Sequence, residues 1–566
     1  MKRRALAFCS SLLLVGLAPG STLAVSNVDQ SNAPSAALNY EVSSNYHFAQ
    51  TFTAGITGRL TGVDLCLEVT QAQNVSVYIR AVGGTGMPTG SNLDSSQLSL
   101  PTQSPGWVHF PLSGAVRVTS GSQYAIILVE GTSLTTFAVW GDSYGGGQGL
   151  RANDAGDSSW NNDWTYNGVD HGTWDFAFQT YVDATTYAPG TYHPIDPVRL
   201  LDTRFGNGLN APLSANVPAT FQITGRGGVP SNAVAVTGNL TVVNTTDGWA
   251  VYLGPDPVAS PASSTINFGA GATTANGLTV ALGATGSLSA TYMSGSGNTT
   301  DLVFDVTGYF TADSGGATYH PMAPARLLDT RSGNGLSGKF AANTPRTFQV
   351  TGRGGVPSNA IAVAGNVTVV NETNAWAVYV GPSPQASPMS STLNFVKGDI
   401  KANNLTVALG SGGTLSATYM SSDGSTTDLV FDVTGYYTAD ATGARFVPLV
   451  PARLLDTRSG NGLSGKFAAN TARTFQVTGR GGVPSNAIGV TGNVTVVNET
   501  NAWAVFVGPN PLASPTSSTL NFVKGDIKAN GLTVALGSGG TLSGTYMSTA
   551  GNSTDLVFDV TGYFAP

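Results

Sequence analysis

The sequence predicts an all-β protein of four tandem β-sandwich domains with jelly-roll-like strand patterns. The first observation is a block that occurs three times at a fixed period of 127 residues: the hexapeptide RLLDTR begins at Arg199, Arg326 and Arg453. A period this long indicates tandem copies of a whole domain, because solenoid units have only roughly 20 to 50 residues. The second observation is composition: charged residues make up 10% of the chain and 72 of the 566 residues are glycine, which is typical of sheets with many tight turns.

The first 24 residues predict a secretory signal peptide. The basic residues Lys2, Arg3 and Arg4 precede an apolar stretch over residues 5–17, and small residues precede a cleavage site after Ala24. This stretch is shorter than the roughly 20 residues that span a bilayer. We therefore expect a secreted, extracellular chain without membrane insertion.

Charge and cysteine content narrow the choice of partners. The signal peptide holds three of the 25 basic residues and none of the 32 acidic ones, so the mature chain carries a net charge of −10. A chain this acidic, without a basic face, is a poor nucleic-acid binder. Cys66 is the single cysteine outside the signal peptide, so we expect packing and not an intrachain disulfide to stabilise the fold.

The mature chain divides into an N-terminal β-sandwich, residues 25–183, and three repeats. Short joints rich in small residues separate the repeats, which occupy residues 191–311, 318–438 and 445–566. The second and third copies are nearly identical, whereas the first contains no lysine and carries GAGATT at residues 269–274 in place of VKGDIK. Recent duplication explains the similarity; the alternative is that all copies present the same face to a repetitive ligand. The sequence leaves open whether the repeats form a rod or a pseudo-trimer.

The strand signals within a repeat predict a two-layer sandwich. In the second copy, residues 360–371 form a long apolar run, and residues 376–382 follow after four turn residues, so we expect these two strands to form a hairpin. About eight short strands at intervals of about 8 to 12 residues are typical of a sandwich or jelly roll. The N-terminal unit shows the same strand pattern around one long irregular segment, residues 142–172.

These motifs carry a resemblance to known secreted proteins. The N-terminal segments QTFTAG, TGRLTGVDLCLEV and WGDSYGGG resemble the choice-of-anchor type of β-sandwich module in bacterial surface proteins. The segments PARLLDTRSGNG, VTGRGGVPSNA and TDLVFDVTGYF resemble repeat domains at the ends of secreted bacterial proteins, some of which are attached to hydrolases. The resemblance implies a bacterial cell-surface role, although no catalytic domain is recognisable in this chain.

Aspartate and arginine recur at the same places in each repeat. If Asp329 and Asp432 act together, they would serve acid–base chemistry or calcium binding. The alternative, which we favour, is that Asp432 accepts hydrogen bonds from Arg326 or Arg331 and joins the first strand to the last, because buried carboxylates usually have a cationic partner. The predicted structural pairs involve Asp202, Arg204, Asp305, Asp329, Arg331, Asp432, Asp456, Arg458 and Asp559.

Other signs of catalysis are missing from the sequence. No HExxH or CxxC motif occurs, and two repeats begin with Tyr-His-Pro where the third has Phe446-Val447-Pro448. We therefore expect a protein that is not an enzyme.

The irregular N-terminal segment is the candidate ligand site. Aromatic rings next to carboxylates suit saccharides, because the ring stacks on the apolar face of a sugar while polar groups hold its hydroxyls. The alternative is that the aromatic residues cap the sandwich core. The candidate saccharide-binding residues are Trp140, Asp142, Tyr144, Trp160, Trp164, Tyr166 and Trp174. A structural calcium ion at Asp154, Asp157 and Asp163 is a further hypothesis, and no other cofactor is expected.

Taken together, the sequence favours a secreted surface or matrix protein. We expect adhesion or binding of a polysaccharide or cell-surface glycan through the N-terminal domain, with the repeats as a spacer or as a multivalent face. Two alternatives stay open: the accessory region of an extracellular hydrolase, or a cryptic one, and a structural filament or coat protein.

Overall fold

The computed structural model describes residues 27–566 apart from 43–46, 57, 84, 114–115, 119–121, 131–135, 142–143, 153–159, 162–164, 167–168, 171–174, 185–186 and 284. The predicted signal peptide lies outside this range. In the described part the regular elements are β-strands and one short 3-10 turn, Thr203–Phe205, and the paired strands are antiparallel, so the predicted all-β fold is confirmed. None of the described residues belongs to a helix with the length and apolar character needed to cross a membrane. The chain forms two compact units, Met1–Thr186 and Tyr187–Pro566.

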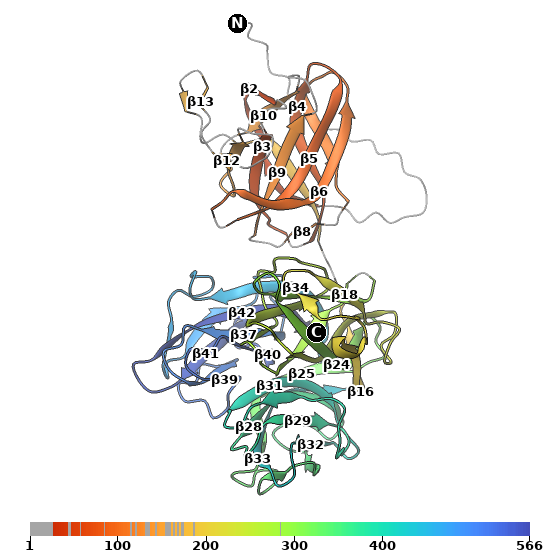
Figure 1. The fold of residues 1–566 in the computed structure, drawn as a ribbon, viewed down its shortest axis with the longest axis vertical. Coiled ribbons are helices and arrows are strands. Elements are labelled where there is room, and N and C mark those ends of the chain that lie inside the picture. The colour runs from red at the N-terminus through yellow and green to blue at the C-terminus, as the bar shows by residue number, and fades with distance from the viewer. Residues whose placement is uncertain are drawn as a thin grey trace. The chain divides into compact units, whose positions relative to one another are not determined.

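The first unit is a sandwich of two antiparallel sheets (Figure 1). One sheet has the order β1 (Asn27–Asn32), β15 (Phe178–Ala184), β4 (Gly58–Val69), β10 (Thr136–Gly141), β2 (Pro34–Val42), with β7 (Gln103–Pro111) and β8 (Arg117–Val118) also paired to β4. The other has the order β12 (Trp160–Asn161), β11 (Gly149–Ala152), β3 (His47–Thr53), β9 (Gln123–Glu130), β5 (Gln73–Val82), β6 (Pro88–Leu100). A small hairpin joins β13 (Thr165–Tyr166) and β14 (Val169–Asp170).

Alternating apolar residues build the core of the first unit. Val75, Val77 and Ile79 of β5 are fully buried, as expected for one face of a half-buried strand. They pack with Phe52 and Phe178 in a single cluster between the two sheets.

Each repeat of the second unit is a sandwich of a five-stranded and a four-stranded sheet. In the first repeat the five-stranded sheet has the order β16 (Thr191–Asp202), β24 (Thr299–Thr311), β19 (Ala233–Val243), β22 (Thr274–Ala281), and β17 (Leu213–Ser214) also pairs with β24. The four-stranded sheet has the order β18 (Ala219–Gln222), β23 (Ser287–Met293), β20 (Trp249–Gly254), β21 (Ile266–Phe268). In the second repeat the five-stranded sheet has the order β25 (Thr318–Asp329), β33 (Thr426–Thr438), β28 (Ala360–Val370), β31 (Lys401–Ala408), and β26 (Phe340–Ala341) also pairs with β33. The four-stranded sheet has the order β27 (Arg346–Gln349), β32 (Thr414–Met420), β29 (Trp376–Gly381), β30 (Leu393–Phe395). In the third repeat the five-stranded sheet has the order β34 (Arg445–Asp456), β42 (Ser553–Ala565), β37 (Gly489–Val497), β40 (Lys528–Ala535), and β35 (Phe467–Ala468) also pairs with β42. The four-stranded sheet has the order β36 (Arg473–Gln476), β41 (Thr541–Met547), β38 (Trp503–Gly508), β39 (Leu520–Phe522).

The predicted hairpin between residues 360–371 and 376–382 is wrong. β28 and β29 belong to different sheets, and the turn between them carries the chain from one layer of the sandwich to the other. Both faces of β28 are buried, because the five-stranded sheet packs against its own four-stranded sheet on one side and against neighbouring repeats on the other.

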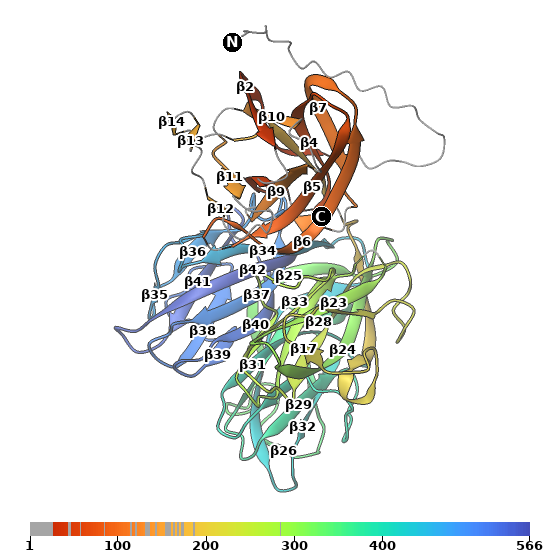
Figure 2. The ribbon, with the colours of Figure 1, turned by 45° about the horizontal axis from the view of Figure 1, so that its top comes forward.

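The three repeats close into a ring with pseudo-threefold symmetry (Figures 1 and 2). The edge strands β22, β31 and β40 of the three five-stranded sheets contact one another at the centre. An edge strand exposes backbone groups that need partners. Asparagine side chains of the neighbouring repeat supply them here: Gly277 N donates to Asn403 Oδ1 at 2.8 Å, Asn404 N to Asn530 Oδ1 at 3.1 Å, and Gly531 N to Asn276 Oδ1 at 2.7 Å.

We call Asn276, Asn403 and Asn530 the asparagine ring. All three are buried, and each Nδ2 donates to a second asparagine in a neighbouring repeat, for example Asn276 to Asn493 Oδ1 at 3.0 Å. The strands approach closely, since a Cβ atom on Gly277 would lie 1.8 Å from the Asn404 carbonyl oxygen. Glycine at this position therefore permits the contact at the centre of the ring.

An aromatic cluster forms a second contact among the three repeats. Its rings meet across the repeat boundaries in cyclic order: Tyr192 lies 4.5 Å from Tyr437, Tyr319 lies 4.1 Å from Phe564, and Phe446 lies 4.6 Å from Phe310, measured between ring centroids. The residues just before each repeat add backbone pairs in the same order, Tyr192 with Ala317, Tyr319 with Ala444, and Phe446 with Gly190. The last of these pairs joins the third repeat to the start of the first.

Candidate functional site

The structure places the predicted structural aspartates and arginines in one network per repeat. In the second repeat Arg326 donates to both carboxylate oxygens of Asp432, at 2.9 and 3.0 Å, and joins β25 to β33. Arg331 pairs with Asp329 instead, at 2.9 and 2.7 Å. The first and third repeats contain the equivalent contacts of Asp202, Arg204, Asp305, Asp456, Arg458 and Asp559.

These carboxylates have partners of opposite charge, and their pKa values follow from that environment. The Arg331 guanidinium lowers the pKa of Asp329. Burial raises the pKa of Asp432, and the Arg326 guanidinium opposes that shift. The same Arg326 side chain also reaches the next repeat, where it donates to the Thr516 carbonyl at 2.8 Å. The network therefore contributes to cohesion within and between repeats.

Most of the predicted N-terminal site lies outside the residues that the structure describes. This holds for Asp142, Trp164 and Trp174, for the side chains of Trp140 and Tyr166, and for the predicted calcium ligands Asp154, Asp157 and Asp163. Among the residues that are described, no group of three or more His, Cys, Asp or Glu side chains is arranged to hold a metal ion.

Tyr144 and Trp160 are described, and both pack against the sandwich. The Tyr144 ring meets Phe178 edge to face at 5.1 Å, and its hydroxyl donates to Gln30 Oε1 at 2.6 Å. Trp160 packs on a small apolar cluster with Ala49, Ile127 and Leu150. Tyr144 thus packs against the core between the two sheets, as in the alternative interpretation, whereas Trp160 packs on a separate apolar cluster.

Each repeat exposes one tryptophan that the sequence pattern does not single out. Trp249, Trp376 and Trp503 occupy equivalent positions and expose 58%, 69% and 58% of their surface. Each begins a strand of the four-stranded sheet with a positive φ, of 146°, 137° and 134° respectively. Residues other than glycine rarely adopt such a φ, and holding one there costs on the order of 1 to 3 kcal/mol. In the sequence, WAVYVG is typical of a core strand, and nothing in it signals that the indole points outward.

A buried tyrosine holds the turn before each exposed tryptophan. The Tyr419 hydroxyl donates to the Asn374 carbonyl at 2.7 Å, and Tyr292 and Tyr546 make the same contact with Asp247 and Asn501 at 2.7 Å each. All three tyrosines are fully buried. The tryptophans therefore project from anchored turns.

Polar side chains lie beside the Trp249 indole. Next to Trp249 is a groove of about 340 Å³, lined by Asn216, Asp247 and Ser294 among others. Asn216 Nδ2 donates to the Ser294 carbonyl at 2.8 Å, and Ser294 Oγ donates to Asp247 Oδ2 at 3.0 Å. An aromatic face next to carboxylate, amide and hydroxyl groups provides the chemistry for holding a sugar ring.

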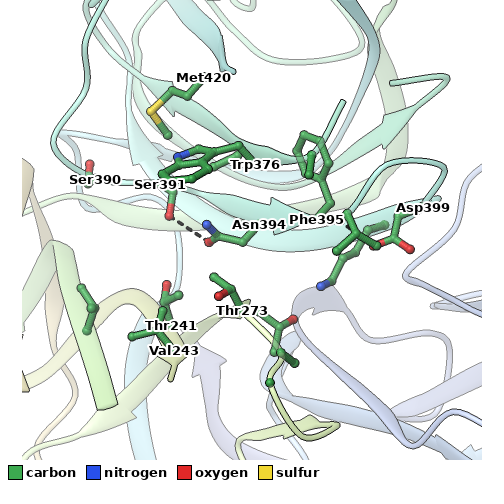
Figure 3. Close-up of a pocket in the computed structure, with 18 of the residues that line it drawn as sticks. Thr241, Val243, Thr273, Trp376, Ser390, Ser391, Asn394, Phe395, Asp399 and Met420 are labelled. Carbon is green, nitrogen blue, oxygen red and sulfur yellow. Dashed lines mark hydrogen bonds between the residues drawn. The ribbon is translucent and has the colours of Figure 1, made fainter. Parts of the chain in front are cut away.

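A larger cleft opens beside Trp376. It has a volume of about 740 Å³ and is lined by residues of all three repeats. Figure 3 shows Trp376 and Met420 on one side of it, with Thr241, Val243 and Thr273 of the first repeat on the other. Ser391 and Asn394 lie between them, joined by a hydrogen bond of 2.9 Å.

No family model matches the sequence, and no curated protein matches it. The resemblance to modules of bacterial surface proteins therefore stays a hypothesis that rests on its motifs.

Substitution of Arg326 tests the structural role of the network. Arg326→Ala leaves the buried Asp432 carboxylate without its bidentate partner, so we expect the free energy of unfolding to fall by about 3 kcal/mol. Arg445→Ala, which removes a guanidinium without a side-chain hydrogen bond in the described structure, should change it by less than about 0.5 kcal/mol. Denaturant unfolding measures both. Equal effects of the two variants would contradict the structural role.

Two buried glutamates are expected to make the stability of the second and third repeats depend on pH. Glu372 and Glu499 are each 5% exposed, their carboxylate oxygens have no hydrogen-bond partner among the described residues, and burial raises the pKa of both. A raised pKa in the folded state means that their contribution to stability is present at low pH and is lost as pH rises through the folded pKa.

We therefore expect the double variant Glu372→Gln/Glu499→Gln to have a higher Tm than the parent at pH 8 and an unchanged Tm at pH 4. The first repeat carries Thr245 at the equivalent position, so Thr245→Ser is a control that should show no such difference between the two pH values. Calorimetric melting at both pH values measures the effect. A lower Tm of the double variant at pH 8 would show that the ionised carboxylates stabilise the fold.

Proposed function

We propose that this protein is a secreted, non-catalytic bacterial adhesion protein that binds saccharide polymers through the tryptophans of its repeats. The predicted signal peptide and the motifs that resemble those of bacterial surface proteins support secretion and surface location. In this proposal the repeats are the multivalent binding face and not a spacer.

The observation that carries the proposal is the triplicate exposure of strained tryptophans. Trp249, Trp376 and Trp503 combine large apolar exposure with a backbone conformation that costs free energy. Neither property serves stability, because glycine would relieve the strain and a polar residue would suit the exposure. Unfavourable geometry that recurs in three places is best explained by a ligand that the indole contacts.

The closed ring suits a repetitive ligand. The asparagine ring and the aromatic cluster fix the repeats relative to one another, so the three indoles are presented at fixed separations. When one site is occupied, a polymer reaches the other two at a high effective concentration, and avidity exceeds the affinity of a single site by roughly 10² to 10⁴.

Replacement of all three tryptophans by glycine separates binding from stability. The triple variant Trp249→Gly/Trp376→Gly/Trp503→Gly removes the stacking surface and also relieves the positive φ, so we expect unfolding free energy within about 1 kcal/mol per site of the parent value. Retention on a polysaccharide array should fall by at least about 100-fold, because avidity is lost together with each site. A single replacement should have a smaller effect.

Phe205→Ala is the matched control, since Phe205 is an exposed aromatic residue, 80% accessible, at a different place in the first repeat. It should bind like the parent. If the triple variant binds as well as the parent, or if the parent is retained on no polysaccharide, the proposed function is wrong. A large loss of stability in the triple variant would show that the indoles serve packing.

A further inference from the structure

The cleft beside Trp376 exists because the first repeat differs from the other two. Three equivalent loops meet there, residues 267–274, 394–401 and 521–528, and they carry NFGAGATT, NFVKGDIK and NFVKGDIK. Where the later copies have Val396 and Ile400, the first has Gly269 and Thr273. The smaller side chains leave open space on one side of the ring, and the pseudo-threefold symmetry is broken at this place.

The walls of the cleft combine aromatic, apolar and amide groups. Trp376, Met389 and Val396 are exposed apolar residues on the second repeat, with 69%, 90% and 62% of their surfaces accessible. Asn394 of the second repeat and Asn521 of the third add amides, and Thr241 and Thr273 add hydroxyls opposite the indole (Figure 3). These groups extend the polar and aromatic surface around Trp376 into an open cleft.

Two lysines make this cleft different from the groove beside Trp249. Lys401 and Lys528 line it, whereas the first repeat has Thr274 at the equivalent position. No carboxylate of the described residues lies within ion-pair distance of Lys401, and Lys528 has one distant contact, 3.8 Å to Asp526. Burial lowers the pKa of Lys401 to about 8, and the like charge of Lys528 adds to the shift.

The other charged groups of the cleft are already engaged. Asp399 accepts a hydrogen bond from Val396 N and Asp526 accepts one from Val523 N, both at 3.1 Å, so each closes its own loop. Arg199 and Arg204 are paired with Asp202 and Asp305. Lys401 therefore has no ion-pair partner among the described residues, and Lys528 has its 3.8 Å contact with Asp526, while the charges of Asp399 and Asp526 partly offset the two neighbouring ammonium groups.

We propose that this cleft binds an acidic sugar residue, with its ring on Trp376 and its anionic substituent between Lys401 and Lys528. This inference rests on the proposed function and adds the chemical class of the ligand. A carboxylate of a uronic acid and a phosphate on a sugar share the required chemistry, because each relieves the repulsion between the two lysines. The first and third tryptophan sites then serve neutral or acidic units of the same polymer without this selectivity.

The first repeat supplies the test variant. Lys401→Thr/Lys528→Thr introduces the residue that the fold already accepts at Thr274, so the variant should fold like the parent. Lys397→Thr/Lys524→Thr removes the same charge from exposed positions of the same loops that do not line the cleft. Titration calorimetry of the full chain with trigalacturonate, with its methyl ester and with a phosphodiester-linked hexose polymer compares the ligands.

We expect the parent and the Lys397→Thr/Lys524→Thr variant to bind trigalacturonate at least about tenfold more tightly than its methyl ester, and the Lys401→Thr/Lys528→Thr variant to lose this preference. Preference for the phosphate polymer instead, lost in the same variant, supports the site and assigns phosphate as the anion. Equal affinity for the acid and the ester, or a preference that survives in Lys401→Thr/Lys528→Thr, overturns the inference.

The proposed function is tested separately from this inference. Binding of neutral saccharides that depends on Trp249 and Trp503 would stand even if the acid preference were absent. If the triple tryptophan variant still binds trigalacturonate as the parent does, the indole contact is wrong and both proposals fail.

Discussion

The second unit depends on side-chain amides that bind backbone groups at the edges of three strands. β22, β31 and β40 are edge strands, and the asparagine ring binds one backbone N–H of each strand in cyclic order. Two repeats would leave one open edge, and a fourth repeat would have no position in the cycle. The closed ring therefore accounts for a copy number of three. The buried asparagine amides also make the arrangement specific, because a buried amide without a hydrogen-bond partner costs about 1 to 3 kcal/mol.

This closure gives the strained tryptophans a rigid frame. Trp249, Trp376 and Trp503 hold a backbone conformation that a flexible surface loop would relax, and the surrounding fold maintains it through buried tyrosines such as Tyr419. The divergence of the first repeat adds one feature that perfect symmetry would exclude. Residues 271–274 of its GAGATT loop line the cleft beside Trp376, at the place where the later copies carry the bulkier VKGDIK loop.

Much of the fold could be predicted because its signals are local. Strand patterns and turns indicate the sandwiches, and the sequence favours a structural role for Asp432 as the hydrogen-bond acceptor that joins the first strand of a repeat to its last, which the structure pairs with Arg326. The ring could not be predicted, because Gly531 and its partner Asn276 are 255 residues apart and asparagine in such a sequence suggests a turn or strand end. One signal is present in the sequence: residues 360–370 of β28 lack alternation, as expected for a strand that is buried on both faces and unlike half of a solvent-exposed hairpin.

Amide hydrogen exchange in single asparagine variants tests the closed ring most directly. In the parent, the amides of Gly277, Asn404 and Gly531 should exchange slowly, because each is bound by an asparagine of another repeat. Asn403→Ala should speed up exchange first at Gly277, Asn530→Ala at Asn404, and Asn276→Ala at Gly531. Loss of protection at Gly531 on substitution of Asn276 would place the first and third repeats in contact. Unchanged exchange at Gly531 in that variant would contradict the ring and favour repeats that lie in a row.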